Sequence, residues 1–148
     1  MKRVLVIYGS TTGNSEFVAR RIGEILANSG VAVELRDVVN VQISDLFSDF
    51  ELIILGCSTW GEEEVGFQED FESFYFGLSE VDFTGKPFAL FGCGDSGYKH
   101  FCGAVDELED RLQQQGAEFV GAVLKIDGEP EEALEQIDQW SSEIAAGL

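Results

Sequence analysis

Apolar residues along the chain alternate between short continuous runs and stripes of helical spacing. Residues 4–8, 52–57 and 87–92 are almost wholly apolar, as in parallel strands buried on both faces, and 31–35 and 119–126 predict two more strands. Between the runs, apolar positions recur every three or four residues, which indicates one buried face of a helix. The predicted helical positions are Val18, Ile22, Ile25 and Leu26; Phe67, Phe71, Phe74, Tyr75 and Leu78; Phe101, Val105, Leu108 and Leu112; and Leu134, Ile137 and Ile144.

The last helix is predicted to contain Pro130 near its first turn. Glu131 and Glu132 would follow it there, where their negative charges interact favourably with the positive end of the helix dipole. A short helical turn is expected around 44–47. Strand–helix alternation repeated five times predicts an α/β protein, a single domain over residues 1–148 with a doubly wound sheet. Its five parallel strands would follow the order 2-1-3-4-5, with helices on both faces.

Ligands of such sheets bind beyond the carboxyl ends of the strands, where the strand order reverses. The segments to inspect are therefore the loops after the first, third and fourth strands, which are residues 9–15, 58–66 and 93–102. The fold alone does not define a function, so the functional argument rests on these loops.

Charge narrows the choice of partners. The 148 residues contain 28 Asp and Glu against 9 Lys and Arg, a net charge of −19. Residues 1–40 carry +1, so the remainder carries −19 − 1 = −20. Such a surface repels phosphate backbones and anionic lipids, which disfavours nucleic-acid and membrane binding and favours basic partners. Solubility or adaptation to salt is the competing explanation of the acidic excess.

Thiols and the single imidazole limit the chemistry further. Three cysteines, Cys57, Cys93 and Cys102, without a C-x-x-C spacing argue against a disulfide framework, and with His100 they lack the spacing of a zinc site. Buried thiols are the better interpretation, and no metal site is expected. The chain shows no secretory or transmembrane segment, so the cytoplasm is the expected compartment.

The first loop has the composition of an anion site. Residues 9–15, Gly-Ser-Thr-Thr-Gly-Asn-Ser, place four hydroxyls and two glycines between a buried strand and a helix N-terminus, where free backbone N–H groups and the dipole attract anions. An ordinary loop with Thr12 as N-cap would explain one hydroxyl but not four. The nucleotide motifs G-x-x-x-x-G-K-[ST] and G-x-G-x-x-G are missing, and the loop contains no Lys or Arg. These features predict a site for one terminal phosphate.

The second and third loops each contain an aromatic residue in a polar setting. Trp60 and Tyr98 could sandwich a flat conjugated ring. The surrounding residues are acidic and would disfavour an anionic ring while tolerating a neutral one. They are Glu62, Glu63, Glu64, Glu69, Asp70 and Asp95.

These motifs carry a family resemblance. Residues 6–15, the Ser-Thr-Trp-Gly of 58–61 and the Gly-Cys-Gly-Asp-Ser-Gly-Tyr of 92–98 together resemble a short-chain flavodoxin, most closely those of sulfate-reducing bacteria (Desulfovibrio type), over essentially the whole chain. The chain departs from the family at Ser15, where Thr is common, and in the run of three Glu at 62–64. The resemblance implies a low-potential one-electron carrier, not an enzyme, with non-covalent FMN that shuttles between semiquinone and hydroquinone.

The resemblance also implies roles for individual residues. The first loop would bind the phosphate, Ser58 and Asp95 would lie along the ribityl chain, and Trp60 and Tyr98 would cover the two faces of the ring. The peptide between Gly61 and Glu62 would face flavin N5, and other loop residues would meet the pyrimidine edge. The full set expected to bind the cofactor is Ser10, Thr11, Thr12, Gly13, Asn14, Ser15, Ser58, Thr59, Trp60, Gly61, Glu62, Cys93, Gly94, Asp95, Tyr98, His100, Phe101 and Cys102.

Three other functions on this fold fit less well. An FMN-dependent NAD(P)H:quinone reductase needs open space above the ring and basic groups, whereas Tyr98 and an acidic rim are expected. A phosphoacceptor receiver needs acidic residues after the first and third strands, where Gly9-Ser10 and Cys57-Ser58 stand. A Cys-based phosphatase needs a loop that begins with the cysteine and ends with an Arg, and neither Cys57 nor Cys93 begins such a loop. The expected partners of the monomeric carrier are redox proteins with basic docking faces: reductases, cytochromes and hydrogenase-type systems.

Overall fold

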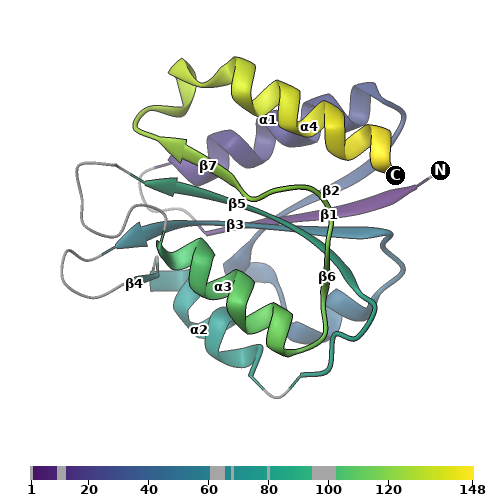
Figure 1. Cartoon of the computed structure of the whole chain (residues 1–148), viewed down its shortest axis with the longest axis vertical. Helices are drawn as coiled ribbons and strands as arrows, with labels where there is room; N and C mark the ends of the chain where they lie inside the picture. Colours follow the sequence, from purple (N-terminus) through teal and green to yellow (C-terminus); the bar gives the residue numbers. More distant parts are fainter. Residues whose placement is uncertain (1, 10–12, 61–65, 68, 80, 95–102) are drawn as a thin grey trace.

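The computed structural model describes residues 2–9, 13–60, 66–67, 69–79, 81–94 and 103–148, of which 59–60, 66–67 and 69–70 are described by their backbone alone. A parallel sheet runs through the centre of the molecule in the order β2-β1-β3-β5-β6, and β7 also pairs with β5 (Figure 1). The strands are β1 (Arg3–Tyr8), β2 (Ala32–Asp37), β3 (Leu52–Trp60), β5 (Pro87–Gly94), β6 (Glu118–Phe119) and β7 (Leu124–Asp127). This order confirms the predicted doubly wound sheet.

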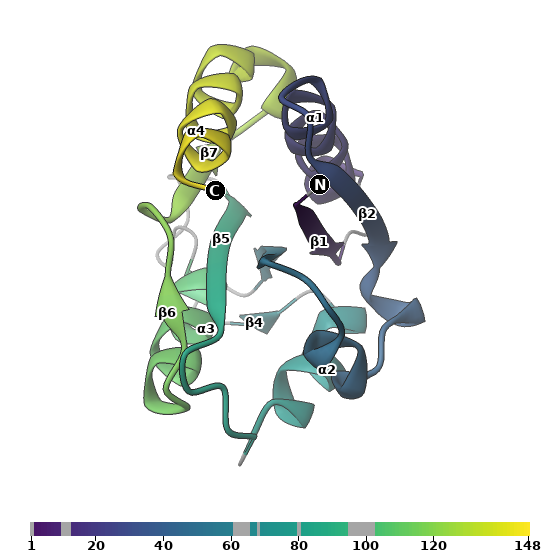
Figure 2. The ribbon, with the colours of Figure 1, turned by 90° about the vertical axis from the view of Figure 1, so that its right-hand side faces the viewer.

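Helices cover both faces of the sheet. Figures 1 and 2 show α1 (Asn14–Asn28) and α4 (Leu134–Gly147) on one face, and α2 (Glu69–Gly77) and α3 (Gly103–Gln114) on the other. Two short 3₁₀ helices, η1 (Val38–Asn40) and η2 (Ile43–Phe47), lead from β2 towards β3, and η2 contains the predicted turn at 44–47. The chain termini lie at the end of the sheet opposite the carboxyl ends of β3 and β5.

Two apolar clusters, one on each face, explain why the strands read as continuous apolar runs. Along β1, Leu5 and Ile7 point to the cluster under α2 and α3, while Val4 and Val6 point to the cluster under α1 and α4. β3 and β5 alternate in the same way, because successive side chains of a strand point to opposite faces. In the central strands β1, β3 and β5, burial on both faces leaves polar side chains only near the strand ends.

Two predicted elements have different boundaries. The strand predicted at 119–126 is two short strands, β6 and β7, separated around Gly121, whose φ of 72° is a left-handed conformation that interrupts an extended strand. Phe67, predicted on the face of a helix, lies in β4 (Gly66–Phe67) instead. β3 continues past its apolar run to Trp60 and pairs antiparallel with β4, so α2 begins only at Glu69.

The C-terminal helix also begins later than predicted. Pro130, Glu131 and Glu132 form a separate 3₁₀ turn, η3 (Pro130–Glu132), and α4 starts at Leu134. Leu134 was predicted to face inward but is 38% exposed, because it occupies the first position of α4 at the edge of the core. Ile137 and Ile144 are buried as predicted. Part of the sequence pattern therefore reflects the turn rather than the helix.

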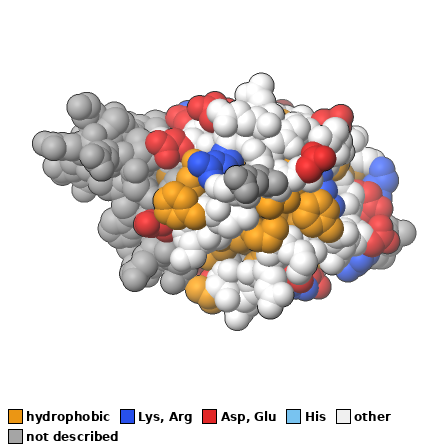
Figure 3. Space-filling model, turned by 90° about the horizontal axis from the view of Figure 1, so that it is seen from below, with side chains coloured by type: hydrophobic (Ala, Val, Ile, Leu, Met, Phe, Trp, Pro, Cys, Tyr) orange, Lys and Arg blue, Asp and Glu red, His pale blue; other side chains and the backbone are white. Residues whose placement is uncertain are grey.

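Hydrophobic side chains gather on the face of the molecule seen from below (Figure 3). The most exposed large ones among the described residues are Phe76 on α2, Val39 in η1 and Phe47 in η2. Phe47 stacks on Phe83 with ring centroids 5.6 Å apart, and the Lys86 ammonium lies 5.7 Å from its ring centroid. Within the part of the chain that is described, no helix is long and apolar enough to cross a membrane.

Candidate functional site

The carboxyl ends of β1 and β3 meet where the strand order reverses, as the fold class requires of a ligand site. β1 ends at Tyr8, and the next residue, Gly9, donates its N–H to the carbonyl of Gly56 in β3 over 3.1 Å. This hydrogen bond fixes the start of the first loop to the neighbouring strand. The chain then re-enters described structure at Gly13, directly before α1.

Helix α1 begins with a glycine that has no side chain to cap it. Gly13 is the N-cap residue, with a φ of 93°, and space is open where a Cβ would lie. Its carbonyl accepts the first helical hydrogen bond, from Phe17 N–H at 2.9 Å. The amides of Asn14, Ser15 and Glu16 belong to the first turn, where a helix leaves its N–H groups without internal partners. Together with the helix dipole, these amides form an anion-binding arrangement.

Beneath the first turn of α1, polar side chains from three elements meet. The Ser15 side chain is completely buried, and its Oγ is 2.9 Å from Ser58 Oγ, in β3. Cys93, in β5, is the register partner of Ser58, and the nearby Ser15 hydroxyl lowers the pKa of its thiol. Burial raises the pKa of the Cys93 thiol to about 11, although Ser15 opposes this effect. Cys93 is therefore protonated at neutral pH.

The charges near this edge are predominantly negative. Burial raises the pKa of Tyr8, and the carboxylates of Glu16 and Asp37 raise it further, while Arg20 opposes them. Arg20 is paired with Glu16, their Nη2 and Oε2 atoms being 2.9 Å apart. As far as the described residues go, an anion at the start of α1 would therefore be bound by hydrogen bonds and the helix dipole, because Arg20 is already paired.

The structure brings together some of the residues that the sequence predicts for the site. Ser15, Ser58 and Cys93 converge, Gly13 caps α1, and Gly94 accepts a hydrogen bond from the Gly128 N–H at 2.9 Å. Asn14 is the first residue of α1, and Thr59 and Trp60 end β3. The remaining predicted residues lie outside the described part of the chain. They are Ser10, Thr11, Thr12, Gly61, Glu62, Asp95, Tyr98, His100, Phe101 and Cys102.

Sequence reasoning missed the role of Gly56. Its register partner in β5 is Phe91, and a Cβ built on Gly56 would be only 1.9 Å from Phe91 Cζ. The aromatic ring therefore covers the glycine, whose carbonyl in turn binds Gly9. A glycine inside an apolar strand run is the signal that could have indicated this close approach.

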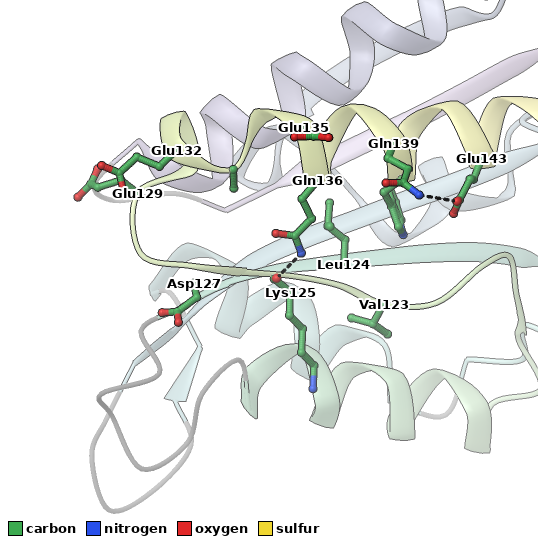
Figure 4. Close-up of a pocket in the computed structure, with 12 residues that line it drawn as sticks. Val123, Leu124, Lys125, Asp127, Glu129, Glu132, Glu135, Gln136, Gln139 and Glu143 are labelled. Carbon is green, nitrogen blue, oxygen red and sulfur yellow. Dashed lines mark hydrogen bonds between the residues drawn. The ribbon is translucent and has the colours of Figure 1, made fainter.

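Beside the site, an acidic groove of about 750 Å³ runs between β7 and α4 (Figure 4). Its lining includes five carboxylates, from Asp127, Glu129, Glu132, Glu135 and Glu143. Lys125, which also lines it, is paired with Asp106 of α3, with Nζ and Oδ1 2.8 Å apart. The described residues contain no group of three or more His, Cys, Asp or Glu placed to hold a metal ion.

The strand order and the donor set define the class of the protein. Main-chain amides at a glycine-capped helix, with the hydrogen-bonded hydroxyls of two serines beside them, offer donors of the kind that a phosphate ester accepts. They lie at the switch point of a doubly wound parallel sheet. The molecule is thus an α/β protein whose site fits a ligand with a terminal phosphate.

Comparison with known proteins identifies the family. The family model described as Flavodoxin matches residues 6–140. A flavodoxin of Maridesulfovibrio salexigens is 46% identical over 145 residues, 98% of each chain, and one of Nitratidesulfovibrio vulgaris (strain Miyazaki F) is 42% identical over the full length of both chains. The crystal structure of oxidised flavodoxin 2 from Bacillus cereus matches with a TM-score of 0.89 at 35% identity, covering 99% of each chain. The chain belongs to the flavodoxin family, whose members are FMN-binding electron carriers and not enzymes.

Proposed function

We propose that this protein is a low-potential, one-electron carrier that holds FMN non-covalently and delivers electrons to redox proteins with basic docking faces, as a cytoplasmic monomer. The observation that carries the proposal is the donor set at the start of α1, where the buried Ser15 hydroxyl meets Ser58 beneath uncapped helix amides. FMN ends in a phosphate, and the described part of the site offers that phosphate hydrogen-bond donors. The buried state of the Cys57 and Cys93 thiols agrees with a reducing compartment.

Different groups of the chain would bind the phosphate and the ring of FMN. The amides of Asn14 and Ser15 and the hydroxyl of Ser15 would bind the phosphate, with Ser10, Thr11 and Thr12 completing the turn, and Ser58, next to Ser15, would lie along the ribityl chain. Trp60 and Tyr98 would cover the ring, and the loop residues after β3 and β5 would meet its polar edge. Bound FMN supplies one-electron chemistry, and its fully reduced ring carries a negative charge.

The acidic surroundings support the low potential. The protein carries a net charge of −19, which repels any negative charge added to the cofactor. At the end of β1, the carboxylates of Glu16 and Asp37 already raise the pKa of Tyr8. Each ~1.4 kcal/mol of repulsion lowers a one-electron potential by about 60 mV. Solvent and salt screen most exposed carboxylates, so only charges within about 10 Å contribute strongly. We expect the second reduction potential to be well below that of free FMN.

The acidic groove supports the choice of partner. Five carboxylates line it, and its lysine is occupied by Asp106. A basic partner would gain long-range attraction from this face, which raises the association rate rather than the final affinity. We expect electron transfer to a basic haem protein to slow steeply with ionic strength. A flat salt profile would favour solubility as the reason for the acidic surface.

Cofactor binding is tested with serine variants. Apoprotein prepared in acid is titrated with FMN and with riboflavin, which lacks the phosphate, while flavin fluorescence is followed. Ser15→Ala should weaken FMN binding about tenfold or more and leave riboflavin binding nearly unchanged, because a charge-assisted hydrogen bond is lost. Ser141→Ala is the matched control, since Ser141 is equally buried but its hydroxyl donates to the Ile137 carbonyl inside α4.

Two results would contradict the proposal. Wild-type apoprotein that binds FMN no more tightly than riboflavin would exclude a phosphate site at α1. Rapid oxidation of NADPH by the FMN-loaded protein alone would indicate a reductase with turnover of its own.

A further inference from the structure

The first turn of α1 contains a carboxylate as well as backbone amides. Glu16 is the third residue of the helix. A negative charge at this position interacts favourably with the positive end of the helix dipole, which is the same end that the phosphate of FMN would use. Two negative groups at one helix terminus repel each other. Glu16 would therefore weaken phosphate binding unless its charge were compensated.

Arg20 compensates the charge of Glu16 from one turn further along α1. Its Nε and Nη2 atoms both lie 2.9 Å from Oε2 of Glu16. Helix side chains lean towards the N-terminus of the helix, so an arginine four residues later reaches back to the first turn. The Arg20 side chain is 59% exposed and that of Glu16 is 39% exposed, so solvent and salt moderate the effect of the two charges.

Both charges act at the end of β1, where the first loop begins. Burial raises the pKa of Tyr8, the last residue of β1; the Glu16 carboxylate raises it further, and the Arg20 guanidinium lowers it. Residues 9–15 contain no Lys or Arg, and Arg20 is the first basic residue of the chain after this loop. A phosphate bound between this strand end and α1 would therefore be influenced by the two charges together.

We propose that the Glu16–Arg20 ion pair determines how strongly the protein prefers FMN to a flavin without a phosphate. Arg20 neutralises Glu16, which would otherwise repel the phosphate from the first turn of α1. The proposal rests on the proposed function, in which this turn binds the phosphate. Arg20 acts here through its charge on Glu16 and needs no contact with the cofactor. When both side chains are made neutral, the local charge is the same as that of the intact pair.

A second arginine of α1 provides a matched control. Arg21 forms hydrogen bonds of 2.7 Å with both carboxylate oxygens of Asp138 in α4, and its Nη1 lies 3.4 Å from Oε2 of Glu24. Neither of these acidic partners belongs to the first turn of α1. Arg20→Gln and Arg21→Gln change the net charge equally, from −19 to −19 − 1 = −20. Only Arg20→Gln removes the compensating charge from Glu16.

The experiment measures the affinity of each apoprotein for FMN and for riboflavin at low ionic strength. Arg20→Gln should reduce the preference for FMN about threefold and Glu16→Gln should raise it about threefold, within the range for one charge near a helix terminus. The double variant Glu16→Gln/Arg20→Gln should regain the wild-type preference within about 1.5-fold, and Arg20→Lys and Arg21→Gln should keep it within the same range. Glutamine is as good a helix former as arginine, so we expect the helix to be retained, and urea unfolding of each apoprotein checks this.

Salt gives a readout that a merely structural role would not change. The difference in preference between Glu16→Gln and Arg20→Gln, about tenfold at low ionic strength, should fall below about twofold in about 0.5 M sodium chloride, where charges are screened beyond about 4 Å. An unchanged preference in Arg20→Gln, an equal loss in Arg21→Gln or in the double variant, or a difference that salt does not reduce would overturn the role of the pair. Failure of the wild type to prefer FMN would instead refute the phosphate site itself.

Discussion

Gly56 is the residue whose substitution tests most directly how the core supports the site. Replacing it with alanine adds one Cβ, which would lie 1.9, 2.1 and 2.2 Å from Cζ, Cε1 and Cε2 of Phe91. Carbon atoms in contact are normally 3.5–4.0 Å apart, so the ring or the strand must move by about 1.5 Å. Phe91 is fully buried, and its ring has no solvent to move into. Gly56→Ala should therefore overpack the core between β3 and β5.

The expected magnitude follows from two opposing effects. Overpacking a core costs about 1–3 kcal/mol, and three ring atoms inside contact distance place this case at about 3 kcal/mol. Alanine gains about 0.5–1 kcal/mol over glycine by restricting the unfolded chain. The net loss is about 2 kcal/mol of the unfolding free energy. FMN should also bind more weakly, because the Gly56 carbonyl accepts the hydrogen bond from Gly9 at the start of the first loop.

Urea unfolding of the apoprotein, followed by far-UV circular dichroism, measures the effect. Gly23→Ala in α1 is the control, since its Cβ would be 3.4 Å from Val33 Cγ1, an ordinary contact, and it should stabilise the protein by about 0.5–1 kcal/mol. In the double variant Gly56→Ala/Phe91→Leu, the loss of unfolding free energy should be at least ~1 kcal/mol smaller than the sum of the losses in the two single variants. The reasoning is refuted if Gly56→Ala is as stable as wild type.

Three further predictions concern other contacts. Trp140 Nε1 donates to the Ala122 carbonyl at 2.7 Å, so Trp140→Phe should lower the unfolding free energy by about 1–2 kcal/mol in urea titrations. Hydrogen bonds from Arg21, at 2.7 Å to each carboxylate oxygen, lower the pKa of Asp138. The stability that Asp138 gains from this pairing is present above the unfolded pKa of about 3.9 and is lost as pH falls through the folded value. The unfolding free energy of Asp138→Asn should therefore be lower than that of the wild type at neutral pH, and the two values should converge in acid. Cys93 should resist iodoacetamide in the native protein at mildly alkaline pH and react in urea, as peptide mapping would show, because its pKa is about 11.

The sequence pattern predicted the elements better than their ends. Apolar runs located β1, β3 and β5, since a strand buried on both faces must be apolar throughout. The same pattern joined β6 to β7 and placed Phe67 in a helix, because apolar spacing does not register a left-handed glycine or an antiparallel return. The exposure of Leu134 likewise depends on where η3 ends and α4 begins.

For the site, the sequence by itself determined the donor types and their order along the chain. Glycines and hydroxyls in residues 9–15 predicted an anion site because a strand followed by a helix exposes free amides there. Only the tertiary structure decided that Ser15, Ser58 and Cys93 lie on one side of the sheet and that Cys57 lies on the other. Strand register and the alternation of side chains determine which face each residue joins. Neither can be read from the spacing of residues that are 35 (Ser58 and Cys93, 93 − 58) or 43 (Ser15 and Ser58) positions apart in the chain.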